Sequence, residues 1–205
     1  VMLFGRIRYS GIVDKSVISA SIGSKHAAVV QDDGSVVVWG GNQGRQCHVP
    51  ENLPKMRSIQ VGFNHTIGMS QDGKLFAWGG NNSALTTIPD TLTEIKNYAA
   101  GPNHNLAVAS NGILVGWGNN LHGQISIPSN LERVEKVASK YYHTLALKED
   151  GSVIAFGDTT NGKIDVPADL SDVIDIATGL NFSLALKSDG TVVSWGSNKY
   201  SSIAV

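Results

Sequence analysis

The pattern of apolar and polar positions predicts short β-strands that are separated by tight turns. Between His143 and Gly157, the sequence HTLALKEDGSVIAFG contains two β-rich apolar runs that an Asp-Gly pair joins. Asp-Gly between two such runs is a strong hairpin signal, because glycine readily adopts the positive φ that the turn requires. The pattern therefore predicts an all-β fold built from antiparallel hairpins.

This pattern recurs along the chain at a constant interval of 39 residues. An aromatic-Gly pair marks each copy, at Trp39-Gly40, Trp78-Gly79, Trp117-Gly118, Phe156-Gly157 and Trp195-Gly196. The same interval relates a histidine series, a turn glycine and a proline: His26, His65, His104, His143 and then Phe182; Gly34, Gly73, Gly112, Gly151 and Gly190; Pro50, Pro89, Pro128 and Pro167. Self-similarity at a fixed period indicates a tandem-repeat architecture.

The period divides the chain into five full repeats and one partial repeat, which we expect to form a single domain over residues 1–205. The full repeats cover about residues 17–57, 58–96, 97–135, 136–174 and 175–205. Residues 1–16 form the partial repeat, because VMLFG at positions 1–5 matches the end of a repeat, with Phe4 at the tryptophan position. The chain is thus predicted to begin inside a repeat.

Each repeat is predicted to form a blade of four short strands. A sheet this small cannot bury both faces alone, and radial stacking into a β-propeller protects the edges of such repeats. Stacking into a solenoid is the alternative. The recurring tryptophan is then expected to pack between adjacent sheets, where truncation to alanine costs about 3–5 kcal/mol.

The repeat resembles that of the regulator-of-chromosome-condensation propellers. The shared pattern is G-x-x-H-x-L-A-L-K-x-D-G-x-V-x-x-W-G-x-N-x-x-G-Q-x-x-V-P, and it covers nearly the whole chain. Lys140, Phe182 and Ser83 depart from it at the first glycine, the histidine and the loop glycine. The short form that ends in V-P is similar to bacterial members, including the propeller-type β-lactamase inhibitory protein. The resemblance implies a propeller fold more strongly than any one function.

Composition fits a folded protein and leaves its compartment open. The chain has 205 residues, of which 41% are hydrophobic and 16% are charged, and its net charge is −1. No apolar run approaches the roughly 20 residues of a membrane span, and no export signal is visible at the start of the sequence. Cytoplasmic and secreted or effector locations both remain open. The single Cys47 excludes an internal disulfide and is expected to be a buried structural thiol.

Motifs that indicate catalysis or metal binding are weak in this sequence. GMSQDGK at residues 68–74 and GDTTNGK at residues 157–163 have the spacing of a phosphate loop, but Leu75 and Ile164 replace the Ser or Thr that would bind magnesium. The histidine series could line an axial channel, yet zinc ligands must converge to about 2 Å. We therefore expect these histidines to fix their own turns by bonding backbone groups. The sequence predicts no enzyme, no cofactor and no metal site.

Variable loops on the repeated frame are the predicted site of binding. Alternating strand directions place the loop between the first two strands on the same face as the loop that follows each aromatic-Gly pair. Large aromatic residues in exposed loops commonly anchor interfaces, which makes Tyr141 and Tyr142 the first candidates, although either ring can instead pack under its own loop. The candidate partner-binding residues are Tyr141, Tyr142, Phe63, Lys25, Arg45, Lys140, Lys163 and Lys199.

Charge favours a protein partner with an acidic surface. The loop face is expected to carry seven basic residues against Asp158 and Asp165, whereas the rest of the chain is net negative. The basic set is Arg6, Arg8, Lys25, Arg45, Lys140, Lys163 and Lys199. A positive face steers acidic proteins towards it, while a total charge near zero argues against nonspecific binding to nucleic acid. No membrane, sequence-specific nucleic acid or small-molecule substrate is predicted.

The sequence is compatible with four functions, and the leading hypothesis is a non-catalytic protein-binding propeller. The resemblance also implies regulation of a Ran-type small GTPase, by nucleotide exchange or activation, in a bacterial effector. The constant period weighs against this function, because it leaves no room for the inserted wedge of the family's exchange factor. Inhibition of an enzyme such as a β-lactamase and a structural or adhesive surface role are the other two alternatives.

Overall fold

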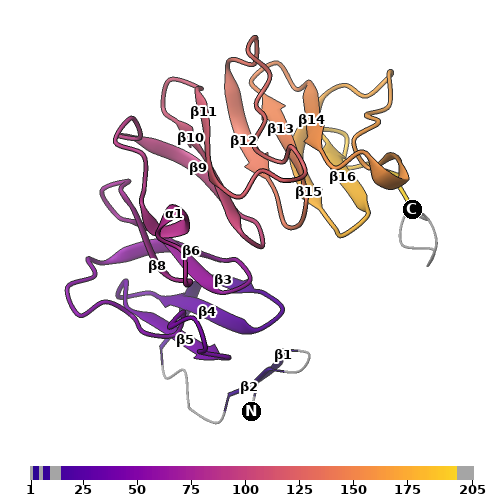
Figure 1. Ribbon diagram of the computed structural model, residues 1–205. Helices are drawn as coiled ribbons and strands as arrows, with labels where there is room; N and C mark the ends of the chain where they lie inside the picture. Colours follow the sequence, from indigo (N-terminus) through magenta and orange to yellow (C-terminus); the bar gives the residue numbers. More distant parts are fainter. Residues whose placement is uncertain (1, 5–6, 10–14, 198–205) are drawn as a thin grey trace. The chain divides into compact units, whose positions relative to one another are not determined.

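The computed structural model describes residues 2–4, 7–9 and 15–197, and strands dominate this part of the chain (Figure 1). The two short helices are α1 (Ser83–Thr86) and the single-turn 3₁₀ helix η1 (Thr160–Gly162). None of the helices in the described part of the chain has the length and apolar character that crossing a membrane requires. The predicted all-β class is confirmed.

Each full repeat forms one three-stranded antiparallel sheet, which we call a blade and number from 1 to 5 along the chain. Blade 1 consists of β3 (Val17–Ile22), β4 (His26–Gln31) and β5 (Val36–Gly40); blade 2 of β6 (Met56–Val61), β7 (His65–Ser70) and β8 (Leu75–Gly79); blade 3 of β9 (Ile95–Ala100), β10 (His104–Ala109) and β11 (Leu114–Gly118); blade 4 of β12 (Val134–Ala138), β13 (His143–Lys148) and β14 (Val153–Gly157); and blade 5 of β15 (Val173–Thr178), β16 (Phe182–Lys187) and β17 (Val192–Gly196). The middle strand of each blade pairs with both neighbours.

A separate two-stranded sheet precedes blade 1 and falls in the predicted partial repeat. It consists of β1 (Met2–Phe4) and β2 (Ile7–Tyr9), which pair antiparallel with Met2 opposite Tyr9. The strand expected over residues 1–5 is therefore present at residues 2–4. Other parts of the predicted partial repeat, at residues 1, 5–6 and 10–14, lie outside the described residues.

The hairpin between the second and third strands forms where the sequence predicts it. In blade 1, Gly34 has a φ of +83°, and the same glycine of the other four blades has a φ between +79° and +86°. A Cβ atom at Gly34 would also lie 2.7 Å from the Cβ of Lys55, the residue before β6 of blade 2. Backbone conformation and space together therefore require glycine at this position.

Blades contain three paired strands instead of the four predicted, because the segment after the third strand folds on itself. In the first repeat, the amide oxygen of Asn42 accepts a hydrogen bond from the backbone N–H of Cys47 (3.0 Å). The amide oxygen of Gln46 accepts from the backbone N–H of Gly44 (2.8 Å). Side chains thus satisfy backbone groups that a fourth strand would pair with a neighbour, and Pro50 has no N–H to pair at all.

Two compact units make up the chain, Val1–Thr93 and Glu94–Val205. Blades 1 and 2 with α1 belong to the first unit, and blades 3, 4 and 5 with η1 belong to the second. Within each unit, successive blades pack face to face. The single domain over residues 1–205 stays a prediction.

Three aromatic residues of the aromatic-Gly pairs, Trp78, Phe156 and Trp195, pack between adjacent blades, as the sequence predicts. Trp78 of blade 2 is 6% exposed and belongs to the same apolar cluster as Ala28 and Val30 of blade 1. Phe156 of blade 4 packs with Leu106 and Val108 of blade 3, and Trp195 of blade 5 packs with Leu145 and Leu147 of blade 4. The core is therefore a series of apolar layers between blades.

Histidines of the repeated series join one blade to the next through their side chains. His26 Nε2 lies 3.0 Å from Thr66 Oγ1, and the Thr66 hydroxyl donates to the backbone carbonyl of Gln46. Because that hydroxyl proton is already used, Nε2 of His26 carries the proton and donates. The expectation that each histidine side chain fixes its own turn through backbone groups is thus corrected to a link between blades.

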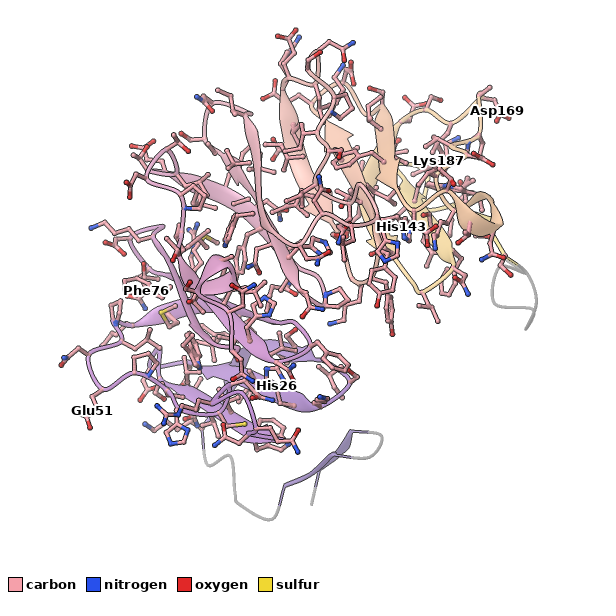
Figure 2. The ribbon with its side chains drawn as sticks, viewed as in Figure 1. His26, Glu51, Phe76, His143, Asp169 and Lys187 are labelled. Atoms are coloured by element: carbon pink, nitrogen blue, oxygen red, sulfur yellow. The ribbon has the colours of Figure 1, made fainter. Side chains whose placement is uncertain are left out.

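The same link recurs in the second unit. His104 Nε2 lies 2.7 Å from Ser139 Oγ, and His143 Nε2 lies 2.9 Å from Ser183 Oγ. All three of these histidines are 0% exposed, and Figure 2 shows His26 and His143 within their own units. A buried imidazole that donates to a hydroxyl across the layer fixes the register between two blades as well as their distance.

Candidate binding surface

Each blade has two ends, which we call the loop end and the hairpin end. The loop end contains the turn between the first two strands and the start of the segment after the third strand. The hairpin end contains the turn between the second and third strands, such as residues 32–35 of blade 1.

Loop-end turns of blades 1, 2, 3 and 5 share one backbone hydrogen bond while the residues that they present differ. In blade 1, the N–H of Gly23 donates to the carbonyl of His26 (3.0 Å), which closes the turn around Ser24 and Lys25. The equivalent bond is 2.9 Å long in blades 2, 3 and 5. In these four blades the same turn presents a different residue pair: Ser24-Lys25, Phe63-Asn64, Pro102-Asn103 and Leu180-Asn181. In blade 4, around Tyr141-Tyr142, the His143 carbonyl accepts instead from the hydroxyl of Ser139.

A second backbone bond ties this turn to the segment after the third strand. The N–H of Gly41 donates to the carbonyl of Lys25 (2.7 Å), and the N–H of Asp158 donates to the carbonyl of Tyr142 (2.9 Å). Blades 3 and 5 have the same bond, at 2.8 Å each. Both loops therefore lie at the same end of the blade, as alternating strand directions predict.

In the first unit, the structure brings Lys25 and Phe63 together at the loop end. The Lys25 ammonium lies 4.1 Å from the centre of the Phe63 ring and 3.3 Å from Oδ1 of Asn64. Phe63 is 37% exposed, so one side of its ring carries the cation and the ring remains open to solvent. This cation–π contact holds a large apolar surface and a positive charge side by side.

Arg45 lies in the neighbouring loop and is exposed. Its φ of +57° turns the backbone sharply, and its N–H donates to the carbonyl of Asn42 (3.1 Å). A Cβ atom at the adjacent Gly44 would lie 3.1 Å from the backbone oxygen of Asn64, which places this loop against the turn of blade 2. We call Lys25, Arg45 and Phe63 the first loop patch.

In the second unit, Tyr141 and Tyr142 are both half-buried at the loop end of blade 4. The Tyr142 ring packs on the ring of His122 from the loop of blade 3, with 4.5 Å between centroids and a tilt of 38°. His122 lies outside the 39-residue histidine series, and the repeat pattern therefore does not single it out. We call His122, Tyr141 and Tyr142 the second loop patch.

Lys140 precedes this pair and replaces the glycine that other blades have at this position. Its backbone N–H donates to the hydroxyl of Thr178 in blade 5 (2.8 Å), and its side chain is half-buried. Burial lowers the pKa of Lys140 from its ordinary value. Lys140 thus stands at the edge of the second loop patch with part of its charge shielded from solvent.

Lys163 does not lie on the binding surface, contrary to the expectation from sequence. Its side chain is 1% exposed, and its ammonium lies 2.7 Å from Oδ2 of Asp158 and 3.2 Å from Oγ1 of Thr160. Burial alone would raise the pKa of Asp158, but the hydrogen bonds from Lys163 and Thr160 lower it to about 2. The carboxylate of Asp158 neutralises this buried ammonium, so Lys163 offers no charge to a partner.

Three other members of the predicted basic set have no described side chain. Lys199 and Arg6 lie outside the described residues, and of Arg8 only its place in β2 is described. The basic residues that the described loop ends do present are Lys25, Arg45 and Lys140. The predicted charge of the whole loop face stays a prediction.

The bond between His143 and Ser183 has the composition of a nucleophile and its base, but its surroundings exclude that role. Both residues are 0% exposed, and the Ser183 hydroxyl donates to the backbone carbonyl of Lys163 (2.8 Å). Burial, together with the positive charge of Lys163, lowers the pKa of His143 to about 4. A substrate cannot reach this hydroxyl, and the equivalent bonds in other blades mark it as structural.

We expect the unfolding free energy of the His143→Phe variant to fall less in acid than that of the wild type. The pKa of His143 is about 4 in the folded chain and near 6.5 when unfolded, so only the unfolded chain binds the proton in this window. Stability is therefore complete above pH 6.5 and falls by about 3 kcal/mol as the pH drops to 4. Phenylalanine suits this layer, because Phe182 occupies the equivalent position in blade 5.

Urea unfolding of both proteins at pH 7.5 and pH 4.5 measures this component. The two proteins share every other titratable group, so the difference between their pH dependences isolates His143. Equal losses of unfolding free energy in wild type and variant would show that His143 does not carry the effect.

Within the part of the chain that the structure describes, no three His, Cys, Asp or Glu side chains are grouped to hold a metal ion.

Cys47, expected to be buried, is partly exposed, and its thiol donates to the carbonyl of Gly41 (3.3 Å).

Comparison with solved structures shows the fold. The chain is similar to human WBSCR16 (TM-score 0.79, 17% identity), covering 90% of this chain and 63% of that one. It is also similar to yeast RCC1 (Prp20) in its complex with Kap60 (TM-score 0.74, 20% identity), covering 88% of this chain and 56% of that one. A third similar structure is the ectodomain of the receptor kinase ACR4 of Arabidopsis thaliana (TM-score 0.68, 23% identity), covering 90% of this chain and 65% of that one.

The chain thus spans less than two thirds of the length of each of these proteins. A search of the curated proteins found no significant match. The family model "Regulator of chromosome condensation (RCC1) repeat" matches residues 56–84, 95–124, 134–163 and 173–201, which together make up more than half of the chain. On its repeats, its blades and these matches, the chain belongs to the RCC1 repeat family.

Proposed function

We propose that this chain is a non-catalytic module that binds another protein through its two loop patches. The observation that carries the proposal is the loop-end turn, whose backbone bond is nearly constant in blades 1, 2, 3 and 5 while the residues that it presents change from blade to blade. A frame that holds its geometry and varies only what it presents is suited to recognition of a partner.

The first loop patch has the composition of an interface anchor. Phe63 offers an exposed aromatic ring, and Lys25 and Arg45 place positive charge beside it. Aromatic rings and basic groups that are already positioned lose little conformational freedom on binding. An acidic and partly apolar surface on the partner matches this chemistry.

The second loop patch adds two tyrosines that neighbouring loops hold in place. The ring contact between His122 and Tyr142 fixes one of them, and Lys140 supplies a partly shielded cation at the edge. Tyrosine contributes a large contact area and a hydroxyl that bonds the partner or water. Each patch is therefore a candidate anchor on its own unit.

Similar solved structures support a protein partner. The yeast protein of one of them was crystallised with Kap60, and the structure of Prp20p from Saccharomyces cerevisiae is described with its binding to Gsp1p and histones. Those partners belong to those proteins. For this chain, they support the use of an RCC1 propeller surface to bind proteins.

Regulation of a small GTPase is the second candidate, because binding to Gsp1p is described for Prp20p. The constant 39-residue period of this chain leaves no inserted segment to reach into a nucleotide site. Release of labelled GDP from a Ran-type GTPase distinguishes the two candidates. Acceleration by this chain would favour exchange activity, and an unchanged rate would favour binding alone.

Affinity capture with matched variants tests the binding proposal. The first variant carries Lys25→Ala and Phe63→Ala, and the second carries Tyr141→Ala and Tyr142→Ala. The control carries Lys74→Ala and Ile113→Ala at the hairpin ends, where both side chains are more than half exposed. Partners are quantified by mass spectrometry, and thermal unfolding confirms that each variant is folded.

We expect each loop-patch variant to lose at least about tenfold of the captured partner, since interface aromatics contribute 2 kcal/mol or more. The hairpin-end control should capture as much as wild type. Equal capture by wild type and both loop variants would contradict the proposed surface.

A further inference from the structure

The loop after the third strand buries one side chain at the same repeat position in each of blades 1 to 4, which we call the inner position. The residue five places earlier, directly after the aromatic-Gly pair, is the outer position. The inner residues, all at most 5% exposed, are Gln46, Leu85, Gln124 and Lys163. The outer residues are Gly41, Gly80, Asn119 and Asp158.

In blades 3 and 4, the outer side chain accepts a hydrogen bond from the inner one. Oδ1 of Asn119 accepts from Nε2 of Gln124 (3.3 Å), and Oδ2 of Asp158 accepts from the Lys163 ammonium (2.7 Å). The outer side chain also accepts from the backbone N–H two residues later. For Asp158 this donor is Thr160 (2.9 Å), and the equivalent bond in blade 3 is 3.0 Å long. The place at the outer position thus holds a carboxylate in blade 4 and an amide in blade 3.

Blade 1 has the inner amide but no outer side chain to accept from it. Oε1 of Gln46 accepts from the N–H of Gly44 (2.8 Å), whereas Nε2 of Gln46 is buried and has no hydrogen-bond partner among the residues that the structure describes. Blade 2 has no such donor, because its outer Gly80 lies next to the apolar Leu85. A buried donor without an acceptor is costly, so Nε2 of Gln46 favours the arrival of an oxygen atom.

The outer position of blade 1 is open to solvent and has basic residues around it. Gly41 is exposed, and the three atoms nearest to a Cβ atom there, all of Lys25, would lie 3.2–3.9 Å away. Residues 40–48 include Arg45 and no acidic residue. The backbone N–H of Gln43, two residues after Gly41, stands at the repeat position of the N–H that binds the outer side chain in blades 3 and 4. The surroundings of Gly41 therefore favour an anionic acceptor.

We propose that the outer position of blade 1 binds a carboxylate of the partner protein, an Asp or Glu side chain that takes the place of the Asp158 carboxylate in blade 4. One carboxylate oxygen accepts from Nε2 of Gln46, and the other accepts from the N–H of Gln43. The inference rests on the proposed function and names the group that the first loop patch selects. That group is an acidic side chain close to an apolar one that packs on Phe63.

Titration of the isotope-labelled chain with acetate, the smallest analogue of an Asp side chain, tests this site without the partner. In NMR spectra at constant ionic strength, we expect the side-chain amide signal of Gln46 to shift with a dissociation constant of about 10–100 mM, as one charge-assisted hydrogen bond allows. The amide of Gln124 already has an acceptor and is the internal control. A Gln46 signal that does not saturate, that shifts no more than the Gln124 signal, or that responds only to inorganic phosphate would overturn the proposal.

Two variants recreate the arrangements of other blades and remove the site. Gly41→Asn supplies the acceptor that Asn119 supplies in blade 3, and Gln46→Leu copies Leu85 of blade 2. Both should abolish the acetate response, followed at the backbone N–H of Gln43, and both should lower partner capture at least about tenfold. Thermal unfolding shows which variants are folded, and either one suffices for the test.

Partner capture separates this proposal from the proposed function. Capture that falls with Lys25→Ala and Phe63→Ala but not with Gly41→Asn or Gln46→Leu would refute the carboxylate site and keep the first loop patch. Capture that responds to none of these substitutions would refute the first loop patch together with its site.

Discussion

Lys163→Met is expected to destabilise the chain by about 3–5 kcal/mol, although methionine fills a similar volume. The substitution removes the ion-pair partner of Asp158, whose side chain is 17% exposed. The hydrogen bond from Lys163 helps to hold the pKa of Asp158 at about 2, so its loss leaves a poorly solvated carboxylate. Urea unfolding at neutral pH, followed by far-UV circular dichroism, measures the loss.

A double variant shows that the loss comes from the broken pair. Asp158 and Lys163 occupy the repeat positions of Asn119 and Gln124, whose amides lie 3.3 Å apart in blade 3. Asp158→Asn with Lys163→Gln recreates that neutral pair, and we expect it to recover most of the unfolding free energy. If Lys163→Met alone costs less than about 1 kcal/mol, the ion pair does not have the structural role assigned to it.

Trp78→Ala is expected to cost about 3–5 kcal/mol, because it opens a cavity in the layer between blades 1 and 2. Trp78 packs with Ala28 and Val30, and its indole N–H donates to the backbone carbonyl of Gln46 (3.1 Å). The same carbonyl accepts from Thr66, the residue that His26 contacts. Thermal or urea unfolding should show a lower midpoint with the native secondary structure retained below it.

The control for this prediction is Trp78→Phe, since Phe156 stands at the same position in blade 4. Phenylalanine keeps most of the buried ring but loses the bond to Gln46 and part of the indole volume, so we expect a smaller loss of about 1–2 kcal/mol. Equal losses for the two substitutions would argue that the indole hydrogen bond, and not the filling of the layer, carries the stability of this junction.

Most of the blade architecture is predictable from the sequence, because each part has a local physical signal. The hairpin glycines mark the turns by their need for positive φ, and the aromatic-Gly pairs mark the buried residue between sheets. The fourth strand is the exception. The segment after each third strand is β-permissive in composition, but Asn42 and Gln46 satisfy its backbone groups locally, and a strand pattern does not reveal such bonds.

The binding surface is less predictable, since burial of a long side chain depends on its neighbours. Lys163 looked like one more basic loop residue, but it forms a buried pair with Asp158. Comparison of repeats contained the signal: a Gln and an Asn of blade 3 are replaced together by a Lys and an Asp of blade 4. The contact between His122 and Tyr142 joins two different loops and has no such signal.

Hydrogen exchange of the captured complex shows whether the partner binds at the loop ends. We predict slower exchange on binding at residues 23–26, 41–47 and 62–65 of the first unit, at residues 119–124 and 140–143 of the second, or at both. The hairpin turns at residues 32–35, 71–74, 110–113 and 149–152 should exchange as in the free chain. Protection of these hairpin turns, with unchanged exchange at the loop ends, would show that the partner binds at the hairpin ends instead.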